Sequence, residues 1–237
     1  RFSPNLAISG DSVIFEVEEG SIIDQSAWVR PGTGLNISGQ VKFIETGISP
    51  TIPFDVSILL DGERTLVSTV NGYFNAQLNA PMESKSHALS FELSGLPAEA
   101  VDGTDSTETL YWIEVDSNQP IPVGVVAPRE GTEITLNELS SVQVELLLSE
   151  QEKLNVDTLQ LFFKVSTANQ QNGPALIEGS EPLIVSGSPV GQSISVSSVI
   201  DIESRLPSDA YQDELLLSVW VKGTDMAGNG ISSSAQF

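Results

Sequence analysis

The sequence predicts an all-β protein built from two antiparallel β-sandwiches in tandem. Short runs of alternating apolar and polar residues recur along the 237 residues, whereas helical periodicity is nearly absent. Two stretches, residues 89–95 and 217–223, share the pattern Leu-Ser-apolar-x-apolar-x-Gly. They start 128 positions apart (217 minus 89), close to the length of one large sandwich domain, so we interpret them as equivalent strands of a duplicated fold.

About seven strands are predicted in the first half of the chain. The alternation indicates strands at residues 12–18, 35–43, 54–60, 64–70, 73–78, 87–95 and 109–116. The dipeptides Asp61-Gly62 and Asn71-Gly72 separate neighbouring strands and favour tight hairpin turns. Hairpins at this spacing indicate antiparallel sheets, and the set suits a sandwich of two sheets.

The stretch from Asp116 to Pro122 is the predicted domain boundary, because Pro120 and Pro122 resist continuation of a strand and stiffen the connection. Strands are then predicted at 123–126, 141–148, 158–166, 182–185, 193–200, 215–225 and 231–237, with a long loop at 168–179 and a short helical turn within 201–213. An apolar pair, a proline and Gly-Thr occur both in residues 28–33 and in residues 125–132, and we interpret them as matching domain starts. We therefore predict sandwiches at 23–117 and 118–237, preceded at 1–22 by an extra strand or the remnant of a preceding module.

Composition excludes several function classes. Asp and Glu outnumber Lys and Arg by 32 to 10, for a net charge of −22, which repels nucleic acid and anionic membranes and attracts cations and basic partners. The same charge also fits plain solubility in a salty medium. The absence of cysteine excludes disulfides, thiolate metal sites and cysteine nucleophiles, and no apolar run approaches the roughly 20 residues that span a bilayer. We interpret the chain as a segment of a longer protein.

Residues 225–229, Asp-Met-Ala-Gly-Asn, follow the strand around Trp220 and resemble the turn between the last two strands of bacterial and archaeal Ig-like repeats. Asp116 followed by Pro120 is similar to the linkers between such repeats. In the first half, residues 39–41 and 72–74, with the runs 56–61 and 89–93, resemble the carboxypeptidase-regulatory or transthyretin-like variety. The resemblance implies two tandem Ig-like sandwiches in a cell-surface or secreted modular protein. Residues 105–107 depart from the Ala-Gly-Asn turn, so we expect divergent repeats.

Signs of catalysis are weak. His87 is the single histidine, no Gly-x-Ser-x-Gly elbow occurs, and we expect His87 at a solvent-facing strand end. The acid pairs Glu16 with Glu18 and Glu114 with Asp116 each share a strand face about 7 Å apart, which overlaps the separation used by glycosidases. Alternating acids also solvate the outer face of a sheet, and we favour that explanation. We predict no catalytic residues and no enzymatic activity.

A structural Ca²⁺ is the more plausible ligand, because hard cations prefer carboxylate and carbonyl oxygens, which turns between strands supply. The predicted metal-binding residues are Asp102, Asp105, Asp225 and Asn229, with Asp116 and Asn118 at the junction next. No run matches the spacing of an EF-hand. In each case the alternative is a side chain that caps its own turn, as Asp and Asn do readily.

Two tryptophans are candidate ligand-binding residues. Trp112 and Trp220 both occupy the outward register of their strands, where an exposed indole can stack against a sugar ring or a neighbouring module. Cover by a loop or an adjacent strand is the alternative. Asn36, in Asn36-Ile37-Ser38, matches the N-glycosylation pattern and points outward from its strand.

We therefore expect a non-catalytic structural or adhesive segment of an extracellular or cell-surface protein. Its modules would act as spacers or assemble through exposed edge strands, with neighbouring modules or identical subunits as partners, glycans as possible ligands, and no nucleic acid or membrane insertion. The alternative is a carbohydrate-binding or accessory module of a larger secreted enzyme. A free-standing enzyme is a distant third.

Overall fold

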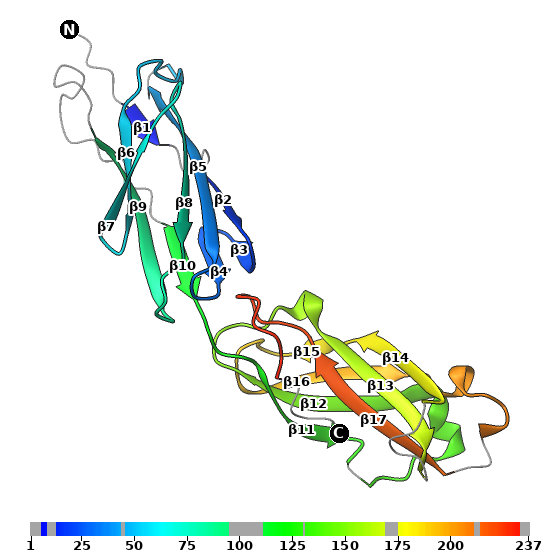
Figure 1. Cartoon of the computed structure of the whole chain (residues 1–237). Coiled ribbons are helices and arrows are strands. Elements are labelled where there is room, and N and C mark those ends of the chain that lie inside the picture. Colours follow the sequence, from blue (N-terminus) through cyan, green and yellow to red (C-terminus); the bar gives the residue numbers. More distant parts are fainter. Residues whose placement is uncertain are drawn as a thin grey trace. The chain divides into compact units, whose positions relative to one another are not determined.

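The computed structural model of the chain describes residues 6–8, 13–43, 46–94, 111–129, 131–168, 175–210 and 214–232. These residues are almost entirely β-strands and their connections (Figure 1). The chain divides into two compact units, Arg1–Ser117 and Asn118–Phe237. Each unit has a hydrophobic core of its own.

The first unit is a sandwich of two sheets. One sheet contains, in spatial order, β3 (Ser21–Ile23), β4 (Ser26–Val29), β10 (Tyr111–Val115), β9 (Ser86–Ser94), β6 (Asp55–Leu60) and β7 (Glu63–Ser68). In the other sheet β5 (Gly34–Phe43) pairs with β1 (Leu6–Ile8), β2 (Ile14–Val17) and β8 (Tyr73–Asn79). Every pairing is antiparallel except that of β4 with β10, which is parallel.

Strand β5 shows why this sequence forms a sandwich. Its alternation places Leu35, Ile37 and Val41 on one face, and all three are fully buried. Gly39 falls on the same face, where an added Cβ would lie 2.4 Å from Cζ of Phe74 on the neighbouring β8. The ring of Phe74 thus fills the space that a larger residue at position 39 would need, and the core stays closely packed.

The second unit has the same two-layer design. One sheet contains, in spatial order, β11 (Ile121–Ala127), β12 (Val142–Glu150), β16 (Gly191–Ile200) and β15 (Ile184–Ser186), and the other contains β14 (Ile177–Pro182), β13 (Gln160–Thr167) and β17 (Leu215–Lys222). Short 3₁₀ helices lie at Leu136–Ser141, Val156–Thr158 and Glu203–Arg205. The last of them confirms the helical turn predicted within residues 201–213.

The strand order of the second unit is that of an immunoglobulin-like sandwich. When its strands are lettered along the chain from A, with β14 as C′, one sheet reads A-B-E-D and the other C′-C-F. In the first unit, β9 pairs with β6 as β17 pairs with β13, so both copies of the repeated motif occupy the F position. The predicted fold class, all-β with two tandem Ig-like antiparallel sandwiches, is confirmed.

Strands β1 and β2, from residues 1–22, pair with β5 in the same sheet as β8. Other elements differ from the prediction. The segments 28–33 and 125–132, predicted to be equivalent domain starts, contain the ends of strands that pair differently. Strand β4 lies parallel to β10, whereas β11 lies antiparallel to β12. The loop predicted at 168–179 extends too far, because β14 already begins at Ile177. Ile231 and Ser232 are not in a strand, and the rest of the predicted final strand lies outside the described residues.

Candidate functional site

A tight turn after β17 buries two of the predicted metal-binding residues. The side chains of Asp225 and Asn229 belong to residues only 1% and 6% exposed. The Asp225 carboxylate accepts a hydrogen bond from the Asn229 backbone N–H and another from the Asn229 side-chain amide, each at 2.8 Å. The Asp225 N–H donates to the Asn229 carbonyl oxygen at 3.1 Å, which closes the turn. Both residues therefore cap their own turn, and metal binding by them stays a prediction.

Glu150 adds a second buried carboxylate in the same unit. It is the last residue of β12, and the two-residue period that buries Val144, Leu146 and Leu148 places Glu150 on the same inward face. Its Oε1 accepts the N–H of Glu152 at 2.9 Å. We did not single out Glu150 from the sequence, although an acid in the inward register of an apolar strand is a signal that could have identified it.

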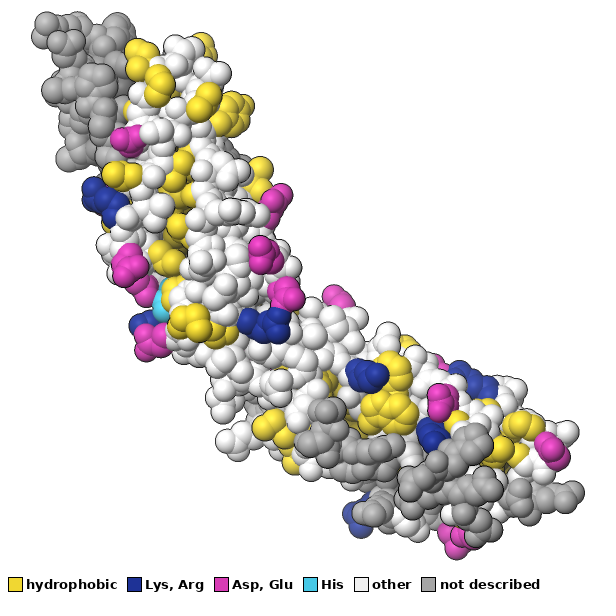
Figure 2. Space-filling model, in the orientation of Figure 1, with side chains coloured by type: hydrophobic (Ala, Val, Ile, Leu, Met, Phe, Trp, Pro, Cys, Tyr) yellow, Lys and Arg dark blue, Asp and Glu magenta, His cyan; other side chains and the backbone are white. Residues whose placement is uncertain are grey.

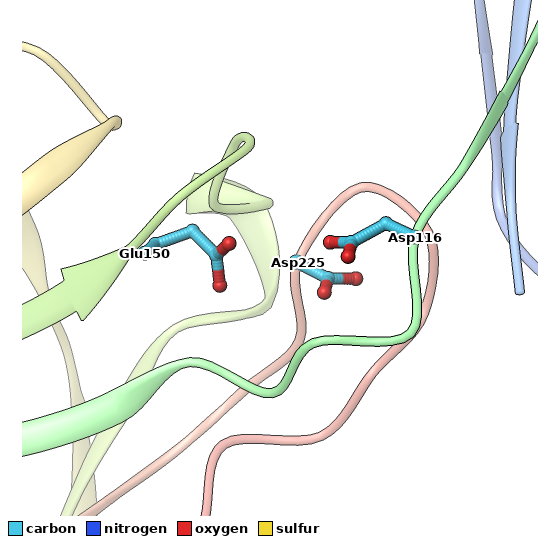
Figure 3. Close-up of side chains that lie close together, drawn as sticks. All are labelled: Asp116, Glu150 and Asp225. Atoms are coloured by element: carbon cyan, nitrogen blue, oxygen red, sulfur yellow. The ribbon is translucent and has the colours of Figure 1, made fainter. Parts of the chain in front are cut away.

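Glu150 and Asp225 form the candidate site of the second unit. A carboxylate oxygen of one lies within 4.8 Å of a carboxylate oxygen of the other (Figure 3). Two buried like charges at this separation repel each other, and a hard cation such as Ca²⁺ would offset that repulsion. Figure 3 also labels Asp116, which belongs to the first unit, where its N–H donates to the Val29 carbonyl oxygen at 3.0 Å.

Three further residues are predicted metal ligands. Asp102 and Asp105 lie outside the described residues. Asn118 is exposed in the connecting segment. Calcium binding at all three positions stays a prediction.

The two candidate tryptophans have different surroundings. Trp112 is 40% exposed on the outer face of β10, opposite Ser26 and Ala88 of the adjacent strands. Trp220 is partly exposed on the outer face of β17 and stacks against Phe162 of β13, with ring centroids 6.0 Å apart and planes 20° from parallel. The ammonium nitrogen of Lys222 lies 4.5 Å from the Phe162 ring centroid. The outward register predicted for both tryptophans is therefore confirmed.

The prediction that His87 faces solvent is wrong. His87 lies in register with Leu89 and Phe91 on the inward face of β9 and is only 2% exposed. Its Nδ1 is 2.5 Å from an oxygen of Asp61, and its Nε2 is 2.8 Å from the Glu83 carbonyl oxygen. Because both partners are acceptors, both hydrogen bonds form only when both ring nitrogens carry hydrogen. In this arrangement His87 holds neighbouring segments together and offers no free nitrogen as a general base.

The acid pairs and the glycosylation motif lie on the outer faces of the first unit, with one exception. Glu16 and Glu18 are exposed, as predicted. Glu114 is half-buried and accepts a hydrogen bond from the Ser86 hydroxyl at 3.0 Å. Asp116 is only 2% exposed, so the prediction that it shares a solvated face is wrong, because β10 ends at Val115. Asn36 is partly exposed on β5, and its glycosylation stays a prediction.

The fold and these sites describe a pair of modular β-sandwiches. No protein-family model matches the chain. No curated protein matches it either. No helix among the described residues is long and apolar enough to cross a membrane.

Solved structures with similarity to the chain include α-2-macroglobulin of Escherichia coli in its native conformation, at 13% identity and a TM-score of 0.32. The alignment covers 100% of this chain but only 15% of that one. The FN1–FN3 domains of chicken CNTN1 align at 11% identity and a TM-score of 0.39, covering 99% and 67% of the two chains. The human OSCAR ligand-binding domain aligns at 10% identity and a TM-score of 0.34, covering 99% and 96%.

Proposed function

We propose that this chain is a non-catalytic structural segment of an extracellular or cell-envelope protein, in which two sandwich modules act as spacers or as units of assembly. The observation that carries this proposal is that His87 is buried and hydrogen-bonded within the first unit. The one histidine of the sequence is buried and bonded through both ring nitrogens, so it supports packing of the first unit and not proton transfer to a substrate.

Exposed sheet edges support a role in assembly. Strand β7 forms one edge of the six-stranded sheet, and Leu66 at its centre is 58% exposed. The unpaired backbone groups of such an edge can accept a strand from another chain. We propose identical subunits or neighbouring modules as the partners.

Sedimentation velocity over a range of protein concentrations tests this assembly. We expect the unmodified chain to self-associate and Leu66→Lys to weaken that association. Leu136→Lys, at a similarly exposed leucine of the second unit, is the control and should associate as the unmodified chain does. A monomer at every concentration, with or without calcium, would contradict assembly and leave only the spacer role. Turnover in a panel of hydrolase substrates would contradict a non-catalytic role.

We also propose that Ca²⁺ binds the second unit through Glu150 and Asp225 and stabilises the turn after β17. The two buried carboxylates lie close enough to share one cation, and carboxylate oxygens are ligands that Ca²⁺ prefers. A cation that binds only the folded state raises stability by about 2.7 kcal/mol at a concentration 100 times its dissociation constant.

Thermal unfolding with and without millimolar CaCl₂ tests the site. We expect Ca²⁺ to raise the Tm of the second unit in the unmodified chain and to have no such effect in Glu150→Gln. Asp201→Asn is a matched control, because Asp201 also accepts a backbone hydrogen bond, from Ser204 at 3.0 Å, in a turn of the same unit. An equal rise in Glu150→Gln, or no rise in the unmodified chain, would overturn the calcium proposal.

A further inference from the structure

An aromatic and basic patch covers the outer face of the β14–β13–β17 sheet. Its central row is Phe162 and Trp220, which are direct neighbours across the two strands. Lys164 follows Phe162 by two residues on β13, and Lys222 follows Trp220 by two residues on β17. Because the strands are antiparallel, the two lysines lie on opposite sides of the aromatic row, each about 7 Å from it along its own strand.

The charge of this patch is opposite to that of the chain. The net charge is −22, yet two of the five lysines in the sequence lie on this one face. Figure 2 shows hydrophobic and basic side chains gathered over β13 and β17. Lys164 stands opposite Glu178 of β14, so its charge is partly matched. Lys222 stands opposite Gln160 and, among the described residues, makes no salt bridge with a carboxylate.

The two rings give this face a local apolar surface. The indole and phenyl groups are both partly exposed and stack with centroids 6.0 Å apart and planes 20° from parallel, which holds the indole of Trp220 in a fixed orientation. The C–H face of a pyranose ring is also flat and apolar, and stacking on an aromatic face removes both surfaces from water. The ammonium of the exposed Lys222 lies over the Phe162 ring, next to Trp220, where it can bind a carboxylate carried by a sugar that stacks on the indole.

We propose that this patch binds an acidic polysaccharide, with a sugar ring on Trp220 and a uronate carboxylate on Lys222. The aromatic row selects a flat sugar ring, and the lysines select those that carry negative charge. Repulsion from the rest of the acidic chain is limited at physiological salt, where screening acts over about 8 Å, whereas a direct contact between ammonium and carboxylate is shorter than that distance.

Isothermal titration with polygalacturonate, in 0.15 M NaCl without added calcium, tests the proposal on the whole chain. We expect binding to the unmodified chain, a loss of about tenfold or more in Trp220→Ala, and a smaller loss in Lys222→Gln. Trp112→Ala and Lys42→Gln are matched controls in the first unit and should bind as the unmodified chain does. Circular dichroism checks that each variant is folded, and Lys222→Gln, at an exposed position, keeps the test valid if Trp220→Ala does not fold.

Three outcomes would overturn the proposal. The first is the absence of polygalacturonate binding by the folded, unmodified chain. The second is equal binding of the neutral polysaccharide dextran, which would show that the lysines select nothing. The third is concentration-dependent self-association abolished by Trp220→Ala, which would make this face a contact between copies of the chain. None of these results bears on calcium binding by Glu150 and Asp225.

Discussion

At the scale of single residues, the contact between Asp61 and His87 shows how polar groups stabilise the first unit. Asp61 begins the turn between β6 and β7, has a positive φ of 52°, and accepts the Ala88 N–H at 3.1 Å as well as the bond with His87. Burial of its carboxylate alone would raise the pKa of Asp61, but the hydrogen bonds from His87 and Ala88 outweigh burial and lower that pKa below its usual value.

Asp61→Asn tests the contribution of this carboxylate to stability. Asn also tolerates a positive φ, so the turn is preserved while the charge is removed. We expect a loss of about 1–2 kcal/mol in the free energy of unfolding at neutral pH, because the hydrogen bonds that the ionised carboxylate of Asp61 accepts are weakened in the uncharged amide. Chemical denaturation followed by tryptophan fluorescence measures this loss.

The lowered pKa of Asp61 also fixes the sign of a pH effect. A carboxylate with a lower pKa in the folded state stabilises that state above its unfolded pKa, about 3.9, and this stabilisation is lost as the pH falls through the folded pKa. Denaturation curves between pH 6 and 2.5 should therefore show a smaller acid-dependent loss in Asp61→Asn than in the unmodified chain. Asp24→Asn, at another turn residue with positive φ (53°), is the control. If Asp61→Asn and Asp24→Asn lost stability with acid to the same extent, Asp61 would not be the source of this pH effect.

Single residues also show where sequence reasoning was incomplete. His87 and Glu150 both fall on the inward face of a strand by simple alternation, and the structure buries both. Polar residue types suggested solvent exposure, whereas register decided their positions. The partners could not be predicted, because Asp61 and Glu83 lie 26 and 4 residues from His87 and meet it only when the sheet has formed.

At the scale of elements, both predicted dipeptides form tight turns, but only Asp61-Gly62 joins two strands paired in one sheet, β6 and β7. Asn71-Gly72 leads from β7 to β8 of the other sheet, and the chain is bridged there only between Val70 and Tyr73. Asp61, Gly62, Asn71 and Gly72 all have a positive φ, between 51° and 84°. The two glycines differ in their surroundings. An added Cβ at Gly62 would meet nothing within 4 Å, whereas at Gly72 it would lie 2.7 Å from the Ser49 Cβ and 2.9 Å from the Val41 carbonyl oxygen.

Gly62→Ala and Gly72→Ala form a matched pair for this difference. The first change should cost about 1–2 kcal/mol, from placing a non-glycine residue at positive φ. The second should cost about 1–3 kcal/mol more, because the methyl group also displaces backbone and side-chain atoms. Urea denaturation of the two variants measures both losses, and equal losses would show that the chain between residues 46 and 53 shifts freely to make room.

Long strands with one buried face were predicted closely. Both β5 and β12 were predicted within about two residues, because a buried face requires alternation over their whole length. Strand β14, at an edge, contains Ile177 as its one large apolar residue, and the sequence does not predict it as a strand, because residues 177–179 fall in the predicted loop. Its pairing with β13 comes from backbone hydrogen bonds, which leave no pattern in the side chains.

At the scale of the whole molecule, the chain holds two separate hydrophobic cores. The core of the first unit includes Phe91 and Ile58, and that of the second includes Phe163 and Ile194. The two sets share no residue, so a change in one core removes packing from that unit alone. Sequence repeats predicted this duplication, because each F strand must bury the same alternating face.

Ile58→Val and Ile194→Val test whether the units unfold separately. Each removes one methylene group from a fully or almost fully buried side chain and should cost about 0.5–1.5 kcal/mol, or roughly 4 °C in Tm per kcal/mol.

The tryptophans identify the unit that unfolds, because Trp28 and Trp112 belong to the first unit and Trp220 to the second. In a Trp220→Phe background, fluorescence should therefore report a lower Tm for Ile58→Val and an unchanged Tm for Ile194→Val. When Trp28 and Trp112 are both replaced by Phe, only Trp220 reports, and fluorescence should show a lower Tm for Ile194→Val and an unchanged Tm for Ile58→Val. A shift of both transitions by either variant would instead show that the units unfold as one cooperative body.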